Sequence, residues 1–312
     1  MKKGRIFTNC LFIVCTLMAA ISFTSCSADS DSSYSGIDES VIKNADSQTE
    51  APFSVVLKAY SDNKDITVKG DVDQTTLFVF DQNGDYYTQV SLDKTYLLQA
   101  KPVEISCPGS KQITVVAWAG LSSDSENISA MSKANIISDL QVSLKQNNGV
   151  AAALPGDLFY GQITLKNTAT KAGVETLKIE RKVSSISLIT KGVIKMLDSR
   201  EGNFYYKVKK TKASFDHNGK LTGEEIEYII PATMDAKGNV VADNTAILPA
   251  SDVTIELYKD DNMILSSKNV ENSEKVSVNE GEQSEITFDL SKNNCNIVVA
   301  DWGTVITHVT IG

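Results

Sequence analysis

Apolar and polar residues alternate with a period of two through much of the second half of the sequence. In 204–209, two aromatic residues and a valine would share one strand face, and a tyrosine and two lysines the other. The same alternation recurs in 253–258 and 286–290. It is typical of antiparallel strands with one face buried and one in water. These segments therefore predict sheets packed through one face.

The first half carries shorter apolar runs, rich in β-branched and aromatic residues and separated by turn residues. The runs are 53–60, 76–80, 86–92, 103–107, 112–118 and 158–165. Residues 127–144 could include a helix, although their helical periodicity is weak. Many short strands without a strand–helix–strand rhythm favour β-sandwiches, and 312 residues suffice for two domains. We predict an all-β fold of two tandem β-sandwich domains.

The stretch Asp81–Asp85 fits either the start of a calcium loop or a hairpin turn. An EF-hand loop needs glycine at its sixth position and glutamate at its twelfth, where this chain has Tyr86 and Leu92. The pair Asn83-Gly84 between two β-rich runs is instead typical of a two-residue type I′ turn. We predict a hairpin here and another at Asn218-Gly219.

The first 25 residues have the three parts of a secretion signal. A positive start precedes the apolar run 10–21, which is too short for a secure membrane span, and small residues then lead to Cys26. This ending resembles a bacterial lipoprotein signal, although Phe23 stands where leucine is usual. We predict that residues 1–25 are a signal peptide and that Cys26 is acylated. An ordinary signal peptide with a chance cysteine is the alternative.

The folded part is predicted to begin after a flexible tether. Residues 26–50 are polar and acidic and cannot bury enough apolar surface to offset the entropy of ordering. Further along, 167–173 has the composition of a connector. We therefore predict a tether at 26–50, an N-terminal sandwich at 51–172 and a C-terminal sandwich at 173–312.

Charge argues against nucleic acid as a partner. The chain has a net charge of −9 and a pI near 4.9, and loss of the signal removes only positive charges. Nucleic acid selects basic surfaces. No second apolar stretch approaches the length of a membrane span.

Two cysteines would remain beside the acylated one. Cys107 and Cys295 lie far apart in the sequence, without the spacing of a metal site. We expect two buried thiols, and a disulfide across the two halves is the alternative.

Four segments, taken in order and spacing, resemble one family. They are Leu77–Gly84, Ile113–Gly120, Asp157–Gly161 and Ile179–Ile186. They are similar to the Bacteroidetes fimbrial anchor and accessory proteins, the minor-fimbrium anchor type of fimbrillin-like lipoproteins. The resemblance implies two transthyretin-like sandwiches in a surface-exposed outer-membrane lipoprotein. Such a protein would hold a fimbria at its base and limit its length.

The resemblance also implies how subunits would join. In strand addition, an extended segment of one chain satisfies the open backbone groups of another chain's sheet. Stalk subunits of related families are cut at a basic site near their first strand. Lys43 is the only basic residue between Cys26 and Val56, and this favours an uncleaved anchor over a cleaved stalk subunit. Asp29 and Asp31 resemble a surface-export signal.

The best pairing segment in the sequence is the C-terminus, which is β-branched nearly throughout and free of proline. Its residues are Thr304, Val305, Ile306, Thr307, His308, Val309, Thr310 and Ile311. Two interpretations stay open: a strand that pairs with fimbrial subunits, or the closing strand of the second domain.

The sequence shows no pattern of residues for catalysis, metal binding or a cofactor. His217 and His308 lack neighbours at metal-ligand spacing, and Glu224-Glu225 is more typical of a solvated strand start than of a catalytic pair. Nucleophile-elbow and phosphate-loop motifs are absent. We predict a protein that is not an enzyme and needs no cofactor.

A glycan or host ligand is the alternative function, in a fimbrial tip adhesin or glycan-binding surface lipoprotein. Exposed aromatic rings stack on sugars. The pairs Tyr86-Tyr87 and Tyr205-Tyr206 would each point one ring outward, and Trp302 is freer than Trp118, which lies in an apolar run.

Overall fold

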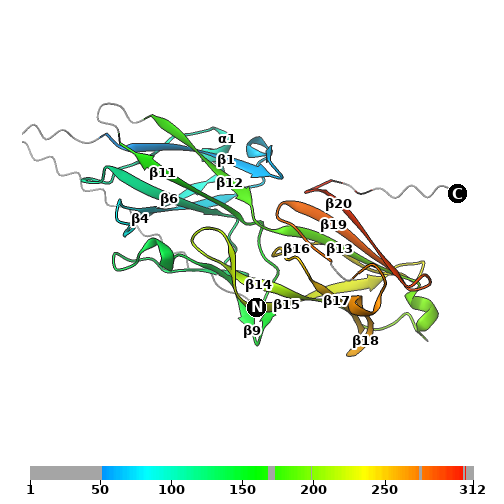
Figure 1. Ribbon diagram of the computed structural model, residues 1–312. Helices are drawn as coiled ribbons and strands as arrows, with labels where there is room; N and C mark the ends of the chain where they lie inside the picture. The colour runs from blue at the N-terminus through cyan, green and yellow to red at the C-terminus, as the bar shows by residue number, and fades with distance from the viewer. Residues whose placement is uncertain (1–50, 168–172, 198, 274–275, 305, 307–312) are drawn as a thin grey trace, which may run out of the picture. The chain divides into compact units, whose positions relative to one another are not determined.

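The computed structural model describes residues 51–167, 173–197, 199–273, 276–304 and 306 (Figure 1). These residues belong to one compact unit, and they form two sheets with very little helix. The all-β prediction is confirmed. The predicted signal peptide and tether, Cys26 included, lie outside the described residues. Within the described ranges, no helix is long and apolar enough to cross a membrane.

The first sheet has the order β2-β1-β12-β11-β6-β3-β4, and β5 pairs with β1. A short α-helix, α1 (Lys94–Leu98), follows β4. The strands are β1 (Phe53–Ser61), β2 (Lys64–Asp65), β3 (Gln74–Phe80), β4 (Tyr86–Asp93), β5 (Val103–Ile105), β6 (Gln112–Ala119), β11 (Phe159–Lys166) and β12 (Val174–Arg181).

The second sheet has the order β18-β17-β14-β15-β16-β13-β19-β20, with the short strands β7 to β10 attached to β14 and β15. Its strands are β7 (Glu126–Ile128), β8 (Val142–Leu144), β9 (Gln146–Asn147), β10 (Val150–Ala151), β13 (Ser184–Lys191), β14 (Phe204–Phe215), β15 (Leu221–Met234), β16 (Val240–Ile247), β17 (Thr254–Lys259), β18 (Asn262–Ser266), β19 (Glu282–Asp289) and β20 (Asn294–Asp301). The helix considered for 127–144 is wrong, because this stretch contains the end of β7, the 3₁₀ turn Ile137–Asp139 and strand β8, joined by turns and irregular backbone.

Strand pairing crosses the predicted boundary between residues 172 and 173 in both directions. β12 follows the boundary but pairs in parallel with β1 of the first sheet. β8 precedes the boundary but pairs with β14 of the second sheet. The boundary itself, which concerns independently folding units, stays a prediction.

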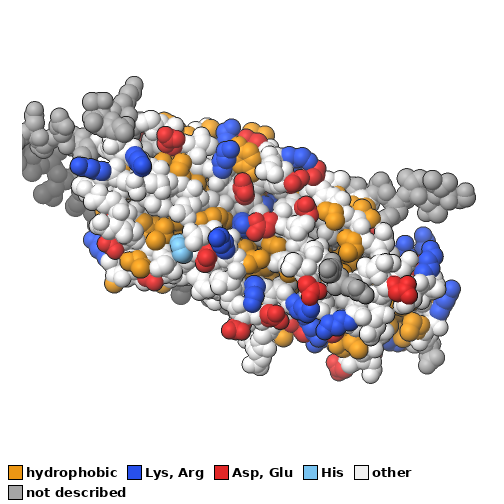
Figure 2. All heavy atoms as spheres, in the orientation of Figure 1, with side chains coloured by type: hydrophobic (Ala, Val, Ile, Leu, Met, Phe, Trp, Pro, Cys, Tyr) orange, Lys and Arg blue, Asp and Glu red, His pale blue; other side chains and the backbone are white. Residues whose placement is uncertain are grey.

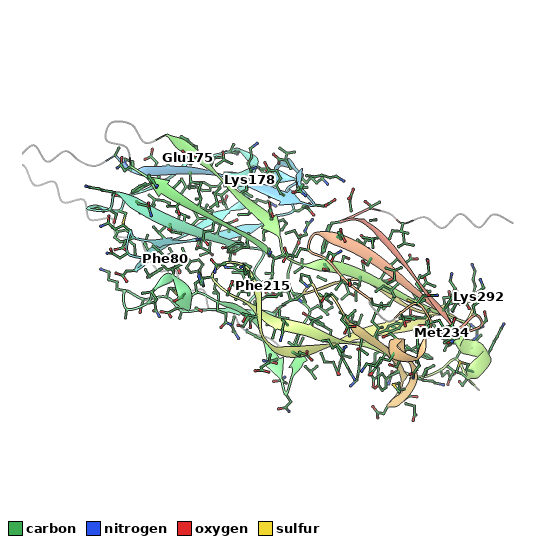
Figure 3. All side chains as sticks on the ribbon, viewed as in Figure 1. Phe80, Glu175, Lys178, Phe215, Met234 and Lys292 are labelled. Atoms are coloured by element: carbon green, nitrogen blue, oxygen red, sulfur yellow. The ribbon has the colours of Figure 1, made fainter. Side chains whose placement is uncertain are left out.

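Two hydrophobic cores form on opposite faces of the first sheet. Leu77 and Val79 of β3 face the first core, which also buries Leu57 of β1. Phe78 and Phe80 face the second core, which they share with Phe215 of β14 (Figure 3). Because both faces of β3 are buried, its sequence is continuously apolar over 77–80 instead of alternating.

The hairpin at Asp81–Asp85 is confirmed, but the predicted type I′ turn is wrong. Gly84 alone adopts a positive φ, of 86°, so the loop is a type I turn closed by a glycine bulge. The Asp81 Oδ1 atom accepts N–H bonds from Asn83 and Asp85, at 2.8 and 3.1 Å. These local bonds favour the three-residue loop over the two-residue one. Asp216 caps the second hairpin in the same way.

Candidate functional site

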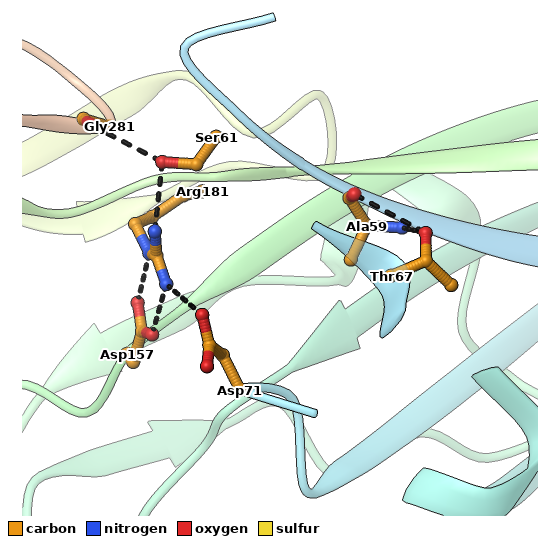
Figure 4. Close-up of polar contacts among 7 residues, drawn as sticks. All are labelled: Ala59, Ser61, Thr67, Asp71, Asp157, Arg181 and Gly281. Atoms are coloured by element: carbon orange, nitrogen blue, oxygen red, sulfur yellow. Dashed lines mark hydrogen bonds and ion pairs between the residues drawn. The ribbon is translucent and has the colours of Figure 1, made fainter. Parts of the chain in front are cut away.

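Arg181, the last residue of β12, is the centre of a polar junction (Figure 4). Its Nε and Nη2 atoms donate to the two carboxylate oxygens of Asp157 at 2.6 and 2.7 Å. Its Nη1 atom donates to the hydroxyl of Ser61 at 2.8 Å, and Asp71 lies 3.7 Å from Nη2. The arginine is only 4% exposed, so these partners replace water around the guanidinium.

Elements next to the second sheet reach the same guanidinium. The ring of Trp302, in the turn after β20, lies 4.4 Å from the guanidinium carbon, on which the ring of Phe159 from β11 of the first sheet also packs, at 4.8 Å. The Ser61 hydroxyl donates in turn to the Gly281 carbonyl at 3.3 Å, just before β19. Arg181 therefore ties the end of the first sheet to two loops of the second.

The segment Asp157–Gly161 contributes to this junction and to a second contact between the sheets. Asp157 binds Arg181, and the Tyr160 hydroxyl lies 3.0 Å from the His217 carbonyl in the second hairpin. Gly161 has no side chain, which lets the Lys178 carbonyl of β12 pass where a Cβ atom would be 2.1 Å away. One of the four family-like segments thus has a structural role at nearly every position.

Burial and ion pairing act in opposite directions on the carboxyl groups of the junction. Burial raises the pKa of the Asp157 carboxyl above its usual value, and the hydrogen bonds from Arg181 offset only part of that rise. Lys64 forms an ion pair with Asp301 and lowers the pKa of that carboxyl. The pKa of Asp62 is raised, because its protonated form can share a hydrogen bond with Asp301.

A cleft of about 720 Å³ opens at the junction, and Lys69, Asp71, Arg181 and Trp302 are among the residues that line it. Arg181 directs all its side-chain nitrogens at partners within the chain. No group of three or more His, Cys, Asp or Glu in the described ranges is placed to hold a metal ion. The arrangement is suited to joining two sheets more than to holding a small ligand.

In the first sheet, the chain's first strand, β1, has pairing partners on both sides. β1 pairs with β12 on one side and with β5 and β2 on the other. Four of its side chains, Phe53, Val55, Leu57 and Ala59, are at most 3% exposed. The strand therefore belongs to the core and is not a loosely added edge.

The second sheet ends in an open edge at β20. The Cys295 N–H donates to the Glu271 carbonyl at 3.0 Å, so the odd-numbered residues direct their backbone groups away from β19. Beyond that contact, Ile297 and Val299 have no outward backbone partner in the part of the chain that the structure describes. Such an edge can accept another extended segment.

The residues proposed from sequence lie mostly beyond the described ranges. Cys26, Val305 and 307–311 are outside them. Thr304 and Ile306 are described, and neither is in a strand. The Thr304 N–H closes a turn onto the Asp301 carbonyl at 3.0 Å. The pairing segment therefore stays a prediction, and β20, which the sequence analysis missed, is the last strand of the described part.

The tyrosines considered for sugar binding are largely engaged within the chain. Tyr206 is fully buried, and its hydroxyl lies 2.7 Å from that of Thr190. Tyr205 stacks on Tyr258 with an interplanar angle of 2°, so each ring covers a face of the other. Tyr87 is 39% exposed. Trp118 is fully buried, as expected.

The two cysteines are both buried and unpaired. Cys107 lies in the first core and Cys295 in the second. The disulfide considered as the alternative from sequence is therefore not formed.

Acidic and basic side chains are interspersed on the face shown in Figure 2. That face carries no broad patch of one sign, of the kind that nucleic acid would select.

The chain is similar in sequence to known fimbrial anchor proteins. Residues 46–308 match the family model of fimbrillin-A associated anchor proteins Mfa1 and Mfa2. A major fimbrium anchoring subunit, FimB of Porphyromonas gingivalis, is 25% identical over 271 residues, covering 83% of this chain and 88% of that relative.

Two solved structures share the fold. The fimbrial anchor protein Mfa2 of Porphyromonas gingivalis matches with a TM-score of 0.58 at 16% identity, covering 80% of this chain and 98% of that one. A DUF1812 protein of Bacteroides thetaiotaomicron matches with a TM-score of 0.63 at 18% identity, covering 83% and 99%.

Proposed function

This chain belongs to the family of fimbrillin-A associated anchor proteins, as its sequence resemblance predicted, and from that premise we propose that it anchors a fimbria to the outer membrane. The relative FimB, named as an anchoring subunit and aligned over most of both chains, supports this role. We propose a structural subunit without enzymatic activity.

The observation that carries the proposal is the filled position of β1. A subunit that continues a polymer by strand addition must offer a vacant strand position to the next subunit. Here the chain's own first strand fills that position, with Val55 and Leu57 fully buried and seven residue pairs in register with β12. A subunit whose own first strand fills this position can end a polymer but cannot offer the position to a further subunit. This supports an anchor that also limits fimbria length.

We propose that joining uses strand addition by the C-terminal segment 304–311. This segment is β-branched and follows directly on β20 through the turn at Asp301–Thr304. The open edge beside Ile297 and Val299 is a second surface at which a fimbrial subunit could add a strand.

We propose that acylated Cys26 provides the membrane attachment. Stable anchoring needs at least two acyl chains, since one chain binds only marginally. If residues 26–50 form the tether predicted from sequence, a random coil of that length would span roughly 25–30 Å on average and let the sheets stand clear of the headgroups.

Replacing the acylated residue tests the proposal. In cells carrying Cys26→Ala, we expect both the protein and its fimbriae in the medium. Ser27→Ala, next to the modified residue, is the matched control and should leave both on the cell. Retention of protein and fimbriae by the Cys26→Ala cells would contradict the anchoring role.

A tip adhesin or glycan-binding lipoprotein was the alternative from sequence. The stacking of Tyr205 on Tyr258 leaves this pair little free ring surface for a sugar, which argues against that reading. In the adhesin case, cells without the protein would keep their fimbriae and lose binding to a host or glycan surface.

A further inference from the structure

We propose that the parallel pair β1–β12, closed at one end by the Arg181 junction, carries the mechanical tension between the membrane tether and the fimbria. This inference rests on the proposed function, because only a subunit held at both ends is stretched. It adds a force-bearing role for particular strands and residues.

The direction of the two strands determines how the pair resists force. β1 and β12 run in parallel, in continuous register from Ser54↔Val174 to Tyr60↔Glu180 (Figure 1). If the start of β1 and the end of β12 are pulled apart, the strands must slide past each other. Sliding loads all the ladder hydrogen bonds together, whereas peeling breaks them one pair at a time. A parallel pair pulled from opposite ends therefore resists force strongly.

The chain enters this pair at the start of β1 and leaves it at the end of β12. The predicted tether leads into β1 at Phe53, so tension from the membrane enters at the start of β1. At the other end, only Lys182 and Val183 separate Arg181 from β13 of the second sheet. Tension between the tether and the second sheet thus reaches the end of β12 along the backbone. This is the geometry in which the pair is sheared.

The chain that follows β20 is connected to the same junction. β20 is the outermost strand of its sheet, and its last residue, Asp301, pairs with Glu282, the first residue of β19. Tension applied beyond Thr304 alone would peel β20 from β19 from that end. The junction opposes such peeling, because Trp302 packs on the Arg181 guanidinium at 4.4 Å and Asp301 pairs with Lys64. The load then passes directly to the end of β12 and to the β1–β2 hairpin.

The ends of the two load-bearing strands are also tied to each other. Arg181 at the end of β12 donates to Ser61 at the end of β1, at 2.8 Å. This cross-link lies in the cluster drawn in Figure 4. It opposes sliding of one strand along the other in addition to the ladder bonds.

Single-molecule pulling tests the sheared pair. The complete chain after residue 26 is held by handles at its two ends, and its lifetime is measured at constant force. Leu57→Ala in β1 and Leu77→Ala in β3 remove the same side chain from the same core, where both are fully buried. We expect Leu57→Ala to shorten the lifetime about tenfold or more and Leu77→Ala less than about threefold, because only Leu57 lies in a loaded strand.

A second pair of variants tests the junction. Trp302→Ala removes the ring over Arg181, while Trp302→Phe keeps an aromatic face there. With Trp302→Ala, we expect a low-force event that releases only the chain of β20 before the main rupture. The Trp302→Phe variant should rupture as the unchanged protein does.

Two results would overturn the proposal. One is an equal loss of lifetime in the Leu57→Ala and Leu77→Ala variants. The other is a first event in the unchanged protein that releases second-sheet strands while β1–β12 stays intact. Both results are measured on the isolated chain, so they are independent of the Cys26→Ala experiment on cells. The anchoring role can hold even if this load path fails.

Discussion

Asp157 and Arg181 form a bidentate ion pair, with both N–O distances below 2.8 Å, between the segment entering β11 and the last residue of β12. The guanidinium is nearly buried, and it also reaches Ser61 on β1. Truncating one partner of a buried ion pair leaves the other charge without compensation. The stability of the first sheet and its attachment to the second therefore depend on this contact.

Arg181→Ala should accordingly lower the free energy of unfolding by about 3–5 kcal/mol. Lys58→Ala, which removes an exposed ion pair with Asp65, should change it by less than about 1 kcal/mol. Urea denaturation of the two variants measures both values. If both variants lost a similarly small free energy of unfolding, water would be able to replace Arg181 as the partner of Asp157.

Gly219 occupies a position that no other residue should fit. Its φ is 67°, and a Cβ atom there would lie 2.4 Å from the Tyr160 ring of the first sheet. Gly109 has a φ of 81° with nothing within 4 Å of a Cβ atom. Gly109→Ala should cost about 1–2 kcal/mol from backbone strain alone. Gly219→Ala should cost clearly more in the same thermal or urea measurement, and equal costs would show that the ring moves aside freely.

The sequence predicted local features of the fold well where a local physical signal exists. Alternation in 204–209 correctly assigned buried and outward faces of β14, and glycine turns marked two hairpins. It did not predict that β1 pairs with β12 across more than a hundred residues, because the apolar pattern of a strand does not encode its partner. The edge strand β20 alternates poorly, since its exposed positions include Val299.

The candidate site was less predictable for a related reason. Asp157 and Arg181 stand in family-like segments, but an isolated acid and an isolated base in a sequence are usually solvated. Only the fold shows that they meet and are buried. The type I′ turn was predicted from Asn83-Gly84, whereas the Asp81 carboxylate, which bonds the loop amides, selects the three-residue loop.

The shared second core makes a prediction about fragments. A chain limited to residues 51–172 would lack β12, and it would expose Phe78, Phe80 and Trp118 in the absence of Phe215 and its neighbours. We expect this fragment to be aggregated or unfolded by circular dichroism and sedimentation. A soluble fragment with a cooperative thermal transition would instead support the boundary predicted from sequence.

The buried cysteines should be inert in the native protein. Burial raises the pKa of the Cys295 thiol to about 11, and only the thiolate reacts with alkylating reagents. At pH 8, about one thousandth of this thiol is ionised, and its reactivity should rise as the pH approaches the raised pKa. We expect mass spectrometry to find Cys107 and Cys295 unlabelled by iodoacetamide in the folded chain and both labelled in urea. Rapid native labelling of Cys295 would contradict its burial.

Deletion of residues 304–312 separates the two interpretations of the C-terminus. If the segment is a joining strand, its loss leaves the described sheets intact, because β19 and β20 pair without it. The shortened protein should then keep its thermal midpoint within a few degrees, reach the cell surface and fail to hold fimbriae. If the segment is the closing strand of the second domain, the midpoint should fall and the protein should be degraded. A shortened protein that is stable and still holds fimbriae of normal length would exclude strand addition by this segment and leave the β20 edge as the joining surface.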